Sequence, residues 1–296
     1  MKDRLESVFG ILNINKPAGV TSRDIVNIVQ RVIRPMKTGH AGTLDPLATG
    51  VLLVPVGRAT RLTEYIHKAS KTYVARFELG KTSDTEDSEG LVTPYAVAAE
   101  PTSEQVQNVV DGFQGKQWQQ PPVYSALRVN GKRAYQLARE GKPVELKRRE
   151  IEVFHIQVLS FSYPQLTVEV NCSSGTYIRS LGRDIGERLQ TGAIMTKLAR
   201  TAIGDLQLQH AVAPEFSSPA DVEAALVNPL RALAGFEQLV LTDLQQQELM
   251  HGRRITVPAV VDSLVLGVSS DDELLTVLQR VDESDHFKPI KNFFPS

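Results

Sequence analysis

One carboxylate stands out as a group that could do chemistry. Asp45 lies in the glycine-flanked segment GHAGTLDPLATG at residues 39–50, directly before an apolar run at 51–57. A loop placed against a buried strand can hold one reactive group rigidly, and a carboxylate held there can act as a nucleophile or proton acceptor. An aspartate before proline also commonly caps a turn or a helix start. Spacing alone therefore leaves a catalytic and a structural role open.

Other reactive side chains give weaker signals. Cys172, the single cysteine, falls on the apolar face of an alternating segment, which suits an inert thiol better than a nucleophile. A hydrolase that uses Cys172 or Ser174 with a histidine is the resulting alternative. The six histidines lie far apart in sequence and form no short zinc motif, and the GxxxxGK[ST] order of a phosphate-binding loop is absent. We expect no metal and no cofactor.

Charge is distributed unevenly along the chain. The net charge is −1, but residues 115–200 contain 14 basic and 7 acidic side chains, whereas residues 201–296 contain 6 and 14. The middle segment can present a positive field to a polyanion. A solvated face whose charges pair with neighbouring carboxylates is the alternative.

The elements around Asp45 can be predicted from periodicity. Residues 10–15 favour a short strand that ends at the turn KPAG, and Ser22 is the predicted N-cap of a helix that stops at Pro35. The apolar run at 51–57 is typical of a buried strand.

Further elements follow the same rules. Alternation predicts half-buried strands at 72–79 and 166–172. Apolar spacing predicts a helix after the cap Thr102 and another along 178–189. The polar segment 81–90 is predicted to be an exposed loop, and residues 115–150 a long insertion outside the core.

Length and composition indicate an ordinary globular protein. The chain has 296 residues, of which 42% are hydrophobic and 23% charged. Charges interrupt the amino terminus and no apolar run is long enough to span a membrane, so we expect neither secretion nor membrane insertion. The lone cysteine indicates a reducing cytoplasm.

Six collinear segments resemble the bacterial TruB family of tRNA pseudouridine synthases, which isomerise uridine 55 of the T loop. They are NKPAGVTS (15–22), GHAGTLDPLATGVL (39–52), KTY (71–73), YSALRVNGKRAY (124–135), CSSGTYIRSLGRDIG (172–186) and LARTAIG (198–204). The resemblance spans roughly residues 8–205. It implies an α+β pseudouridine synthase fold, with a mixed, largely antiparallel central sheet flanked by helices. Residues 1–236 would form the catalytic domain, and 237–296 a small PUA-like β module.

The resemblance also assigns roles to single residues. Asp45 would be the catalytic aspartate, acting either as a nucleophile or as the acceptor of the C2′ proton. Arg179 would pair with it. The family's other substrate-binding positions fall on Lys16, Pro17, His40, Tyr73, Tyr177 and Leu198. Tyr73 would stack on the base, and His40 would fill the space left by the flipped nucleotides.

RNA binding is expected mainly from the insertion at about 121–150. Its cations Lys132, Arg133, Lys147 and Arg148 would contact the backbone of the T stem-loop. The acidic charge of the last 96 residues argues against strong phosphate binding by the PUA-like module. We expect a cytoplasmic monomer that acts on tRNA without an obligate protein partner. A non-catalytic RNA-binding module and a guide-RNA-dependent paralogue are the alternatives, which the intact Asp45 motif and the basic insertion respectively disfavour.

Overall fold

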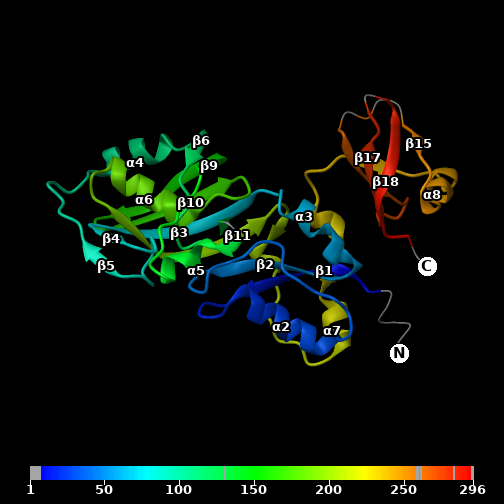
Figure 1. Cartoon of the computed structure of the whole chain (residues 1–296), viewed down its shortest axis with the longest axis horizontal. Coiled ribbons are helices and arrows are strands. Elements are labelled where there is room, and N and C mark those ends of the chain that lie inside the picture. Colours follow the sequence, from blue (N-terminus) through cyan, green and yellow to red (C-terminus); the bar gives the residue numbers. More distant parts are fainter. Residues whose placement is uncertain (1–7, 130, 258–259, 261, 283, 295–296) are drawn as a thin grey trace.

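Two separate β-sheets organise the chain (Figure 1). The computed structural model describes residues 8–129, 131–257, 260, 262–282 and 284–294. The larger sheet has nine strands and the smaller one five. Helices lie against the large sheet, and the small sheet is formed by the carboxy-terminal part of the chain.

The large sheet is mixed, with antiparallel pairing throughout except between β2 and β11, which confirms the predicted fold class. Its strand order is β13 (Leu226–Val227), β1 (Phe9–Lys16), β2 (Thr49–Gly57), β11 (Ala193–Ile203), β3 (Lys71–Leu79), β10 (Gln165–Cys172), β9 (Arg149–Ser162) and β6 (Gly115–Gln119), with β12 (Leu206–Gln207) also paired to β11.

The parallel contact between β2 and β11 depends on a glycine. Gly50 pairs with Arg200 and has a φ of +99°, and a Cβ at this position would lie 2.2 Å from the Arg200 carbonyl oxygen. Only glycine accepts both this conformation and this approach. The loop of Asp45 therefore enters β2 directly beside β11.

Helices bury their apolar sides on the sheet in two places. α4 (Ser103–Asp111) and α6 (Ile178–Arg188) pack in one core with β3, β9 and β10. α2 (Ser22–Ile33) and α7 (Pro219–Ala224) pack in a second core with β1 and β2. α6 thus lies over the centre of the sheet, where its first turn can reach the Asp45 loop.

The small sheet has the order β14 (Gln238–Val240), β16 (Leu264–Val268), β17 (Leu274–Arg280), β18 (His286–Asn292) and β15 (Ile255–Thr256), with α8 (Asp243–Met250) beside it. It packs on the short helices η1 (Arg58–Leu62) and α3 (Thr63–Ile66). The rings of Phe9 and Phe293 stack at 4.9 Å, and Arg58 Nη1 donates to the Phe294 carbonyl at 2.9 Å. The domain boundary at 236/237 stays a prediction.

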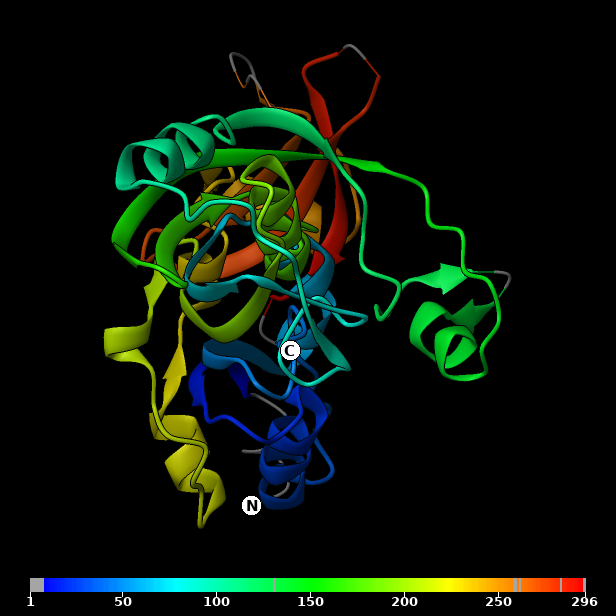
Figure 2. The ribbon, with the colours of Figure 1, turned by 90° about the vertical axis from the view of Figure 1, so that its left-hand side faces the viewer.

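An arm leaves the large sheet after β6 and returns at β9 (Figure 2). It carries β7 (Arg128–Val129), β8 (Lys132–Arg133) and the short helix α5 (Ala134–Arg139). The prediction of an insertion over 115–150 was wrong at its start. Residues 115–119 form β6, because their backbone completes the edge of the sheet by pairing with β9.

Thr21, and not the predicted Ser22, is the N-cap of α2. The Thr21 side chain accepts from the Asp24 backbone N–H, and the Asp24 carboxylate accepts from that of Thr21. Ser22 is buried instead, and its hydroxyl bonds both backbone groups of Leu44. The other short elements of the described chain are β4 (Lys81–Ser83), β5 (Val92–Pro94), η2 (Leu208–His210) and η3 (Pro229–Ala232).

Candidate active site

Asp45 lies opposite the first turn of α6. Its Oδ2 is 3.0 Å from Arg179 Nε, and 37% of its side chain is exposed, compared with 8% of that of Arg179. The carboxylate is therefore open to solvent on one side and paired with a buried guanidinium on the other. The guanidinium orients the carboxylate through a charge-assisted hydrogen bond.

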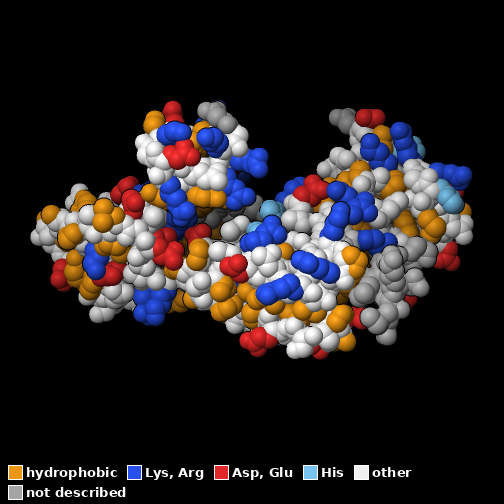
Figure 3. Space-filling view, turned by 60° about the horizontal axis from the view of Figure 1, so that its bottom comes forward, with side chains coloured by type: hydrophobic (Ala, Val, Ile, Leu, Met, Phe, Trp, Pro, Cys, Tyr) orange, Lys and Arg blue, Asp and Glu red, His pale blue; other side chains and the backbone are white. Residues whose placement is uncertain are grey.

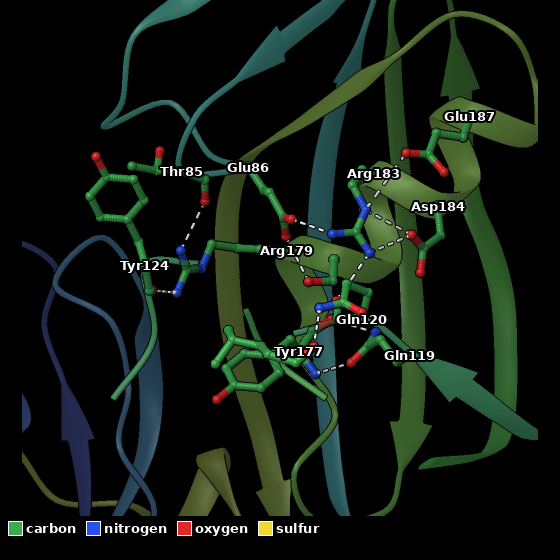
Figure 4. A network of polar contacts seen from close by, with 12 residues as sticks. Thr85, Glu86, Gln119, Gln120, Tyr124, Tyr177, Arg179, Arg183, Asp184 and Glu187 are labelled. Atoms are coloured by element: carbon green, nitrogen blue, oxygen red, sulfur yellow. Dashed lines mark hydrogen bonds and ion pairs between the residues drawn. The ribbon is translucent and has the colours of Figure 1, made fainter. Parts of the chain in front are cut away.

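Arg179 has a partner for each of its three nitrogens, and Figure 4 shows the two backbone oxygens among them. Besides the ion pair through Nε, Nη1 donates to the Thr85 carbonyl at 2.8 Å and Nη2 donates to the Tyr124 carbonyl at 3.0 Å. Asp87 Oδ2 lies 3.6 Å from Nη1. Arg179 thus sits between two carboxylates, with its plane fixed by two backbone oxygens.

Asp87 was missed from the sequence, because segment 81–90 was predicted to be an exposed loop. That prediction was wrong. Asp87 is 3% exposed and accepts from Thr85 Oγ1 at 2.6 Å and from the Glu89 backbone N–H at 3.0 Å. Polar composition suggested solvent, and Asp84, Ser88 and Glu89 are exposed, but Asp87 is buried and Thr85 and Glu86 bond α6. The acidic residues of the segment, four within six positions, were the available signal.

Lys16 bonds the turn after β1 to the Asp45 loop. It is fully buried, and its Nζ donates to the carbonyls of Pro17, Val20 and Pro46 at 2.8, 2.8 and 3.3 Å. Burial lowers the pKa of its ammonium, while Asp45 opposes that shift. A cation that bonds the carbonyl next to Asp45 fixes the loop as well as contributing charge.

Tyr73 and Leu198 come from neighbouring strands and belong to one apolar cluster with Leu44 and Ala48, which flank Asp45. Both are 8% exposed, so each keeps a small accessible surface. Burial raises the pKa of the Tyr73 hydroxyl. The structure therefore gathers an apolar wall beside the carboxylate.

Arg200 is a second residue that sequence reasoning passed over, although it lies in the LART segment. It is 1% exposed, and its guanidinium donates to the Val51 carbonyl at 2.7 Å and to the Gly42 carbonyl at 3.1 Å. These bonds tie the start of the Asp45 loop to β2. Within the described ranges it has no carboxylate within 4.0 Å.

The other predicted residues lie around this centre. His40 is half-buried on the Asp45 loop, its Nδ1 is buried without a hydrogen-bond partner in the described chain, and burial lowers its pKa. Pro17 is exposed at the turn after β1. Tyr177 precedes α6, with the Arg149 guanidinium 4.8 Å from its ring centroid.

The predicted RNA-binding cations lie on the arm. Lys132, Arg133, Lys147 and Arg148 are all exposed, and no ion pair engages them in the part of the chain that is described. Figure 3 shows the arm as a raised lobe beside a hollow, with Lys and Arg side chains on both sides and histidine within it. A hollow rimmed by cations suits an anionic polymer.

A hydrolase that uses Cys172 as its nucleophile finds little support. Cys172 is fully buried, and burial raises the pKa of its thiol to about 11, so the thiolate is suppressed. The described residues contain no group of His, Cys, Asp and Glu side chains arranged for a metal. Among the same residues, no helix has the length and apolar character needed to span a membrane.

Comparison with known proteins gives a consistent result. The sequence model of the N-terminal domain of the TruB family pseudouridylate synthases matches residues 30–178. The tRNA pseudouridine synthase B of Clostridium tetani is 35% identical over 286 residues, which cover 95% of this chain and 98% of that protein. The protein of the same name from Lactobacillus delbrueckii subsp. bulgaricus is 40% identical, with coverages of 87% and 90%.

A solved structure described as an H/ACA RNP bound to a substrate RNA containing 2'-deoxyuridine shares the fold. The TM-score is 0.75 at 23% identity, over 100% of this chain and 88% of the matched one. At this identity the likeness concerns architecture alone.

Proposed function

We propose that this chain, which belongs to the TruB family of pseudouridylate synthases, converts uridine 55 in the T loop of tRNA to pseudouridine. Membership makes the protein a pseudouridine-forming isomerase with the pseudouridine synthase fold. The names of the relatives supply tRNA as the substrate class.

The observation that carries the proposal is the ion pair of 3.0 Å between Asp45 and Arg179, beside the apolar wall formed by Tyr73 and Leu198. One side of the carboxylate stays accessible to solvent, and the other side is paired with the Arg179 guanidinium. An accessible carboxylate beside an apolar surface can attack or deprotonate a sugar held in front of it.

The reaction breaks the bond between uracil N1 and ribose C1′, turns the detached base, and forms a bond between C5 and C1′. N1 gains a proton and C5 loses one, so no electrons are exchanged with a cofactor. Asp45 would assist either by attacking the nucleoside or by accepting the C2′ proton. Tyr73 and Leu198 would hold the base flat during the turn, because an unrestrained uracil would be lost to solvent.

The target uridine must leave the folded T loop before it reaches Asp45. Extruding a nucleotide costs a few kcal/mol, and the cations of the arm would offset this by binding the backbone on either side. His40, on the same loop as Asp45, would fill the vacated space. We further propose that the protein acts as a monomer in the cytoplasm, without a protein partner.

The direct test is to incubate the purified chain alone with an unmodified tRNA transcript and to map pseudouridine by carbodiimide adduct formation and primer extension. We expect one stop, at position 55. Modification at another position would contradict the proposed site. The absence of product, in a preparation whose circular dichroism shows a folded protein, would contradict the proposed activity.

A further inference from the structure

Three consecutive residues of the loop between β4 and β5 each place a different polar group against α6, and Figure 4 shows the first two, Thr85 and Glu86. The Thr85 carbonyl accepts from Arg179, the Glu86 carboxylate accepts from Ser180 Oγ at 2.6 Å and from Arg183 Nη1, and the Asp87 carboxylate faces Arg179. Glu86 therefore sits between the two groups that orient Arg179.

Glu86 is held in this position against its own backbone preference. Its φ of 64° lies in the left-handed region, which residues other than glycine rarely adopt. The Met195 backbone N–H donates to the Glu86 carbonyl at 3.1 Å, and the Ser88 N–H donates to the Met195 carbonyl at 3.0 Å. The loop is thus attached to β11 by its backbone and to α6 by the Glu86 carboxylate.

Arg183 repeats the arrangement of Arg179 one turn later on α6. Its Nη1 bonds Glu86, and its Nη2 donates to the Gln120 carbonyl at 3.1 Å and to Asp184 Oδ1 at 2.7 Å. Each of the two arginines therefore bridges the 85–87 loop to the segment that leads into the arm, at Tyr124 and Gln120 respectively. Residues four apart on a helix lie on the same face, so the two bridges run side by side.

We propose that Glu86 and Arg183 are positioning residues for the isomerisation. They fix the 85–87 loop on α6 and so hold the Thr85 carbonyl and the Asp87 carboxylate in the places that orient Arg179 toward Asp45. This inference rests on the proposed function. Among the described residues, Asp45 forms its ion pair with Arg179 and Arg183 forms one with Glu86, so Glu86 and Arg183 act through Arg179. Burial raises the pKa of the Glu86 carboxyl, and Arg183 opposes that shift.

The expected consequence is a defect in the reaction step with little change in tRNA binding. Without the pair, the 85–87 loop keeps its backbone bonds to β11 and the contacts of Thr85 and Asp87 with Arg179, but it loses the bonds that fix Glu86 on α6. A displacement of about 1 Å at a reacting group can reduce a rate by up to about a hundredfold. The arm cations that would contact the phosphates are untouched by these substitutions.

The test measures the single-turnover rate constant and the tRNA dissociation constant separately for Arg183→Gln, Arg183→Lys, Glu86→Ala and the double variant Glu86→Ala/Arg183→Gln. We expect Arg183→Gln and Glu86→Ala each to reduce the rate constant about tenfold or more, with the dissociation constant changed by less than about threefold. Arg183→Lys should restore part of the rate, because it keeps a cation facing Glu86. The double variant should be no slower than the slower single variant, since the residues act as one unit.

Arg188→Gln is the matched control. Arg188 lies on the same helix, but its Nη1 donates to the Gly112 carbonyl at 3.1 Å and its guanidinium covers the ring of Phe113, on the side of α4. This variant should keep the wild-type rate constant. If Arg188→Gln lost as much rate as Arg183→Gln, the loss would reflect a general weakening of α6, and the inference would be wrong.

Two further outcomes separate the inference from the proposed function. An active wild-type protein with an equally active Arg183→Gln variant would refute the positioning role and leave the proposed function intact. A wild-type protein that forms no pseudouridine in tRNA would refute the proposed function itself.

Discussion

Asp45 is held by residues from separate parts of the chain. Lys16 bonds the carbonyl of Pro46 on one side of it, and Ser22 bonds both backbone groups of Leu44 on the other. Arg179 pairs with the carboxylate itself. The backbone bonds hold the loop in place, and the ion pair with Arg179 orients the carboxylate, which is not fully buried.

A second buried lysine allows a test of the electrostatics at the residue scale. Lys71 is 7% exposed, and burial lowers the pKa of its ammonium from 10.5 to about 8, with Arg200 adding to the shift. Between pH 8 and 10 the folded protein has released this proton while the unfolded chain still holds it. The free energy of unfolding of the wild type, relative to Lys71→Met, should therefore rise with pH over this window.

Urea denaturation of the two proteins at several pH values measures this difference, because other titrating groups cancel between them. Lys71 Nζ also donates to the His67 and Ala69 carbonyls, both at 2.6 Å. Loss of these bonds in Lys71→Met changes the free energy of unfolding by a constant amount, so the test depends only on how the difference varies with pH. A difference that stays flat from pH 8 to 10 would show that Lys71 keeps its proton in the folded state.

At the scale of elements, the site depends on how closely β2 and β11 approach each other. Gly50→Ala would place a Cβ 2.2 Å from the Arg200 carbonyl oxygen in a left-handed backbone conformation. We expect a loss of more than about 2 kcal/mol in the free energy of unfolding, from strain and from separation of the two strands. The urea midpoint should fall accordingly.

Gly235→Ala is the control for this prediction. A Cβ at Gly235 meets nothing within 4 Å, so its effect should stay within about 0.5 kcal/mol. Equal urea midpoints for the two variants would show that the β2–β11 contact does not require glycine.

Much of this arrangement could be predicted from the sequence, where the chemistry of a segment matched its pattern. Alternation identified β3 and β10, and the resemblance placed Asp45 and Arg179 in one site, where the structure shows them in contact. The burial of Asp87 and the position of Glu86 could not be predicted from the 81–90 segment, because their partners Arg179 and Ser180 lie more than ninety positions away.

The same limit applies to single cations. A lysine or arginine in the sequence is expected at the surface, yet Lys16 and Arg200 are fully buried and bond backbone carbonyls of the Asp45 loop. The need for these donors arises only when the loop is folded and its carbonyls have lost water. Periodicity records which residues are apolar and carries no information about which carbonyls require a donor.

At the scale of the whole molecule, charge separates the arm from the carboxy-terminal part of the chain. The arm presents cations beside the hollow in Figure 3, whereas residues 201–296 carry 6 basic and 14 acidic side chains. RNA binding should therefore depend mainly on the arm, with the carboxy-terminal sheet contributing packing on η1 and α3.

Replacing Lys132, Arg133, Lys147 and Arg148 together by glutamine should weaken tRNA binding and flatten its dependence on salt. Each lost phosphate contact removes about 0.7 to 0.9 from the slope of log K against log salt. Titrations of labelled tRNA at several salt concentrations measure the slope. An unchanged slope would mean that the backbone contacts lie elsewhere on the protein.

The central claim is that the Asp45 carboxylate performs the chemistry. Its most direct test is the single-turnover rate of pseudouridine formation by Asp45→Asn on a T stem-loop transcript, with tRNA binding measured in parallel. The amide keeps the size of the side chain and removes its charge, so the rate should fall by at least about a thousandfold while the dissociation constant changes by less than about threefold. An Asp45→Asn protein that forms pseudouridine at a rate near that of the wild type would contradict the claim.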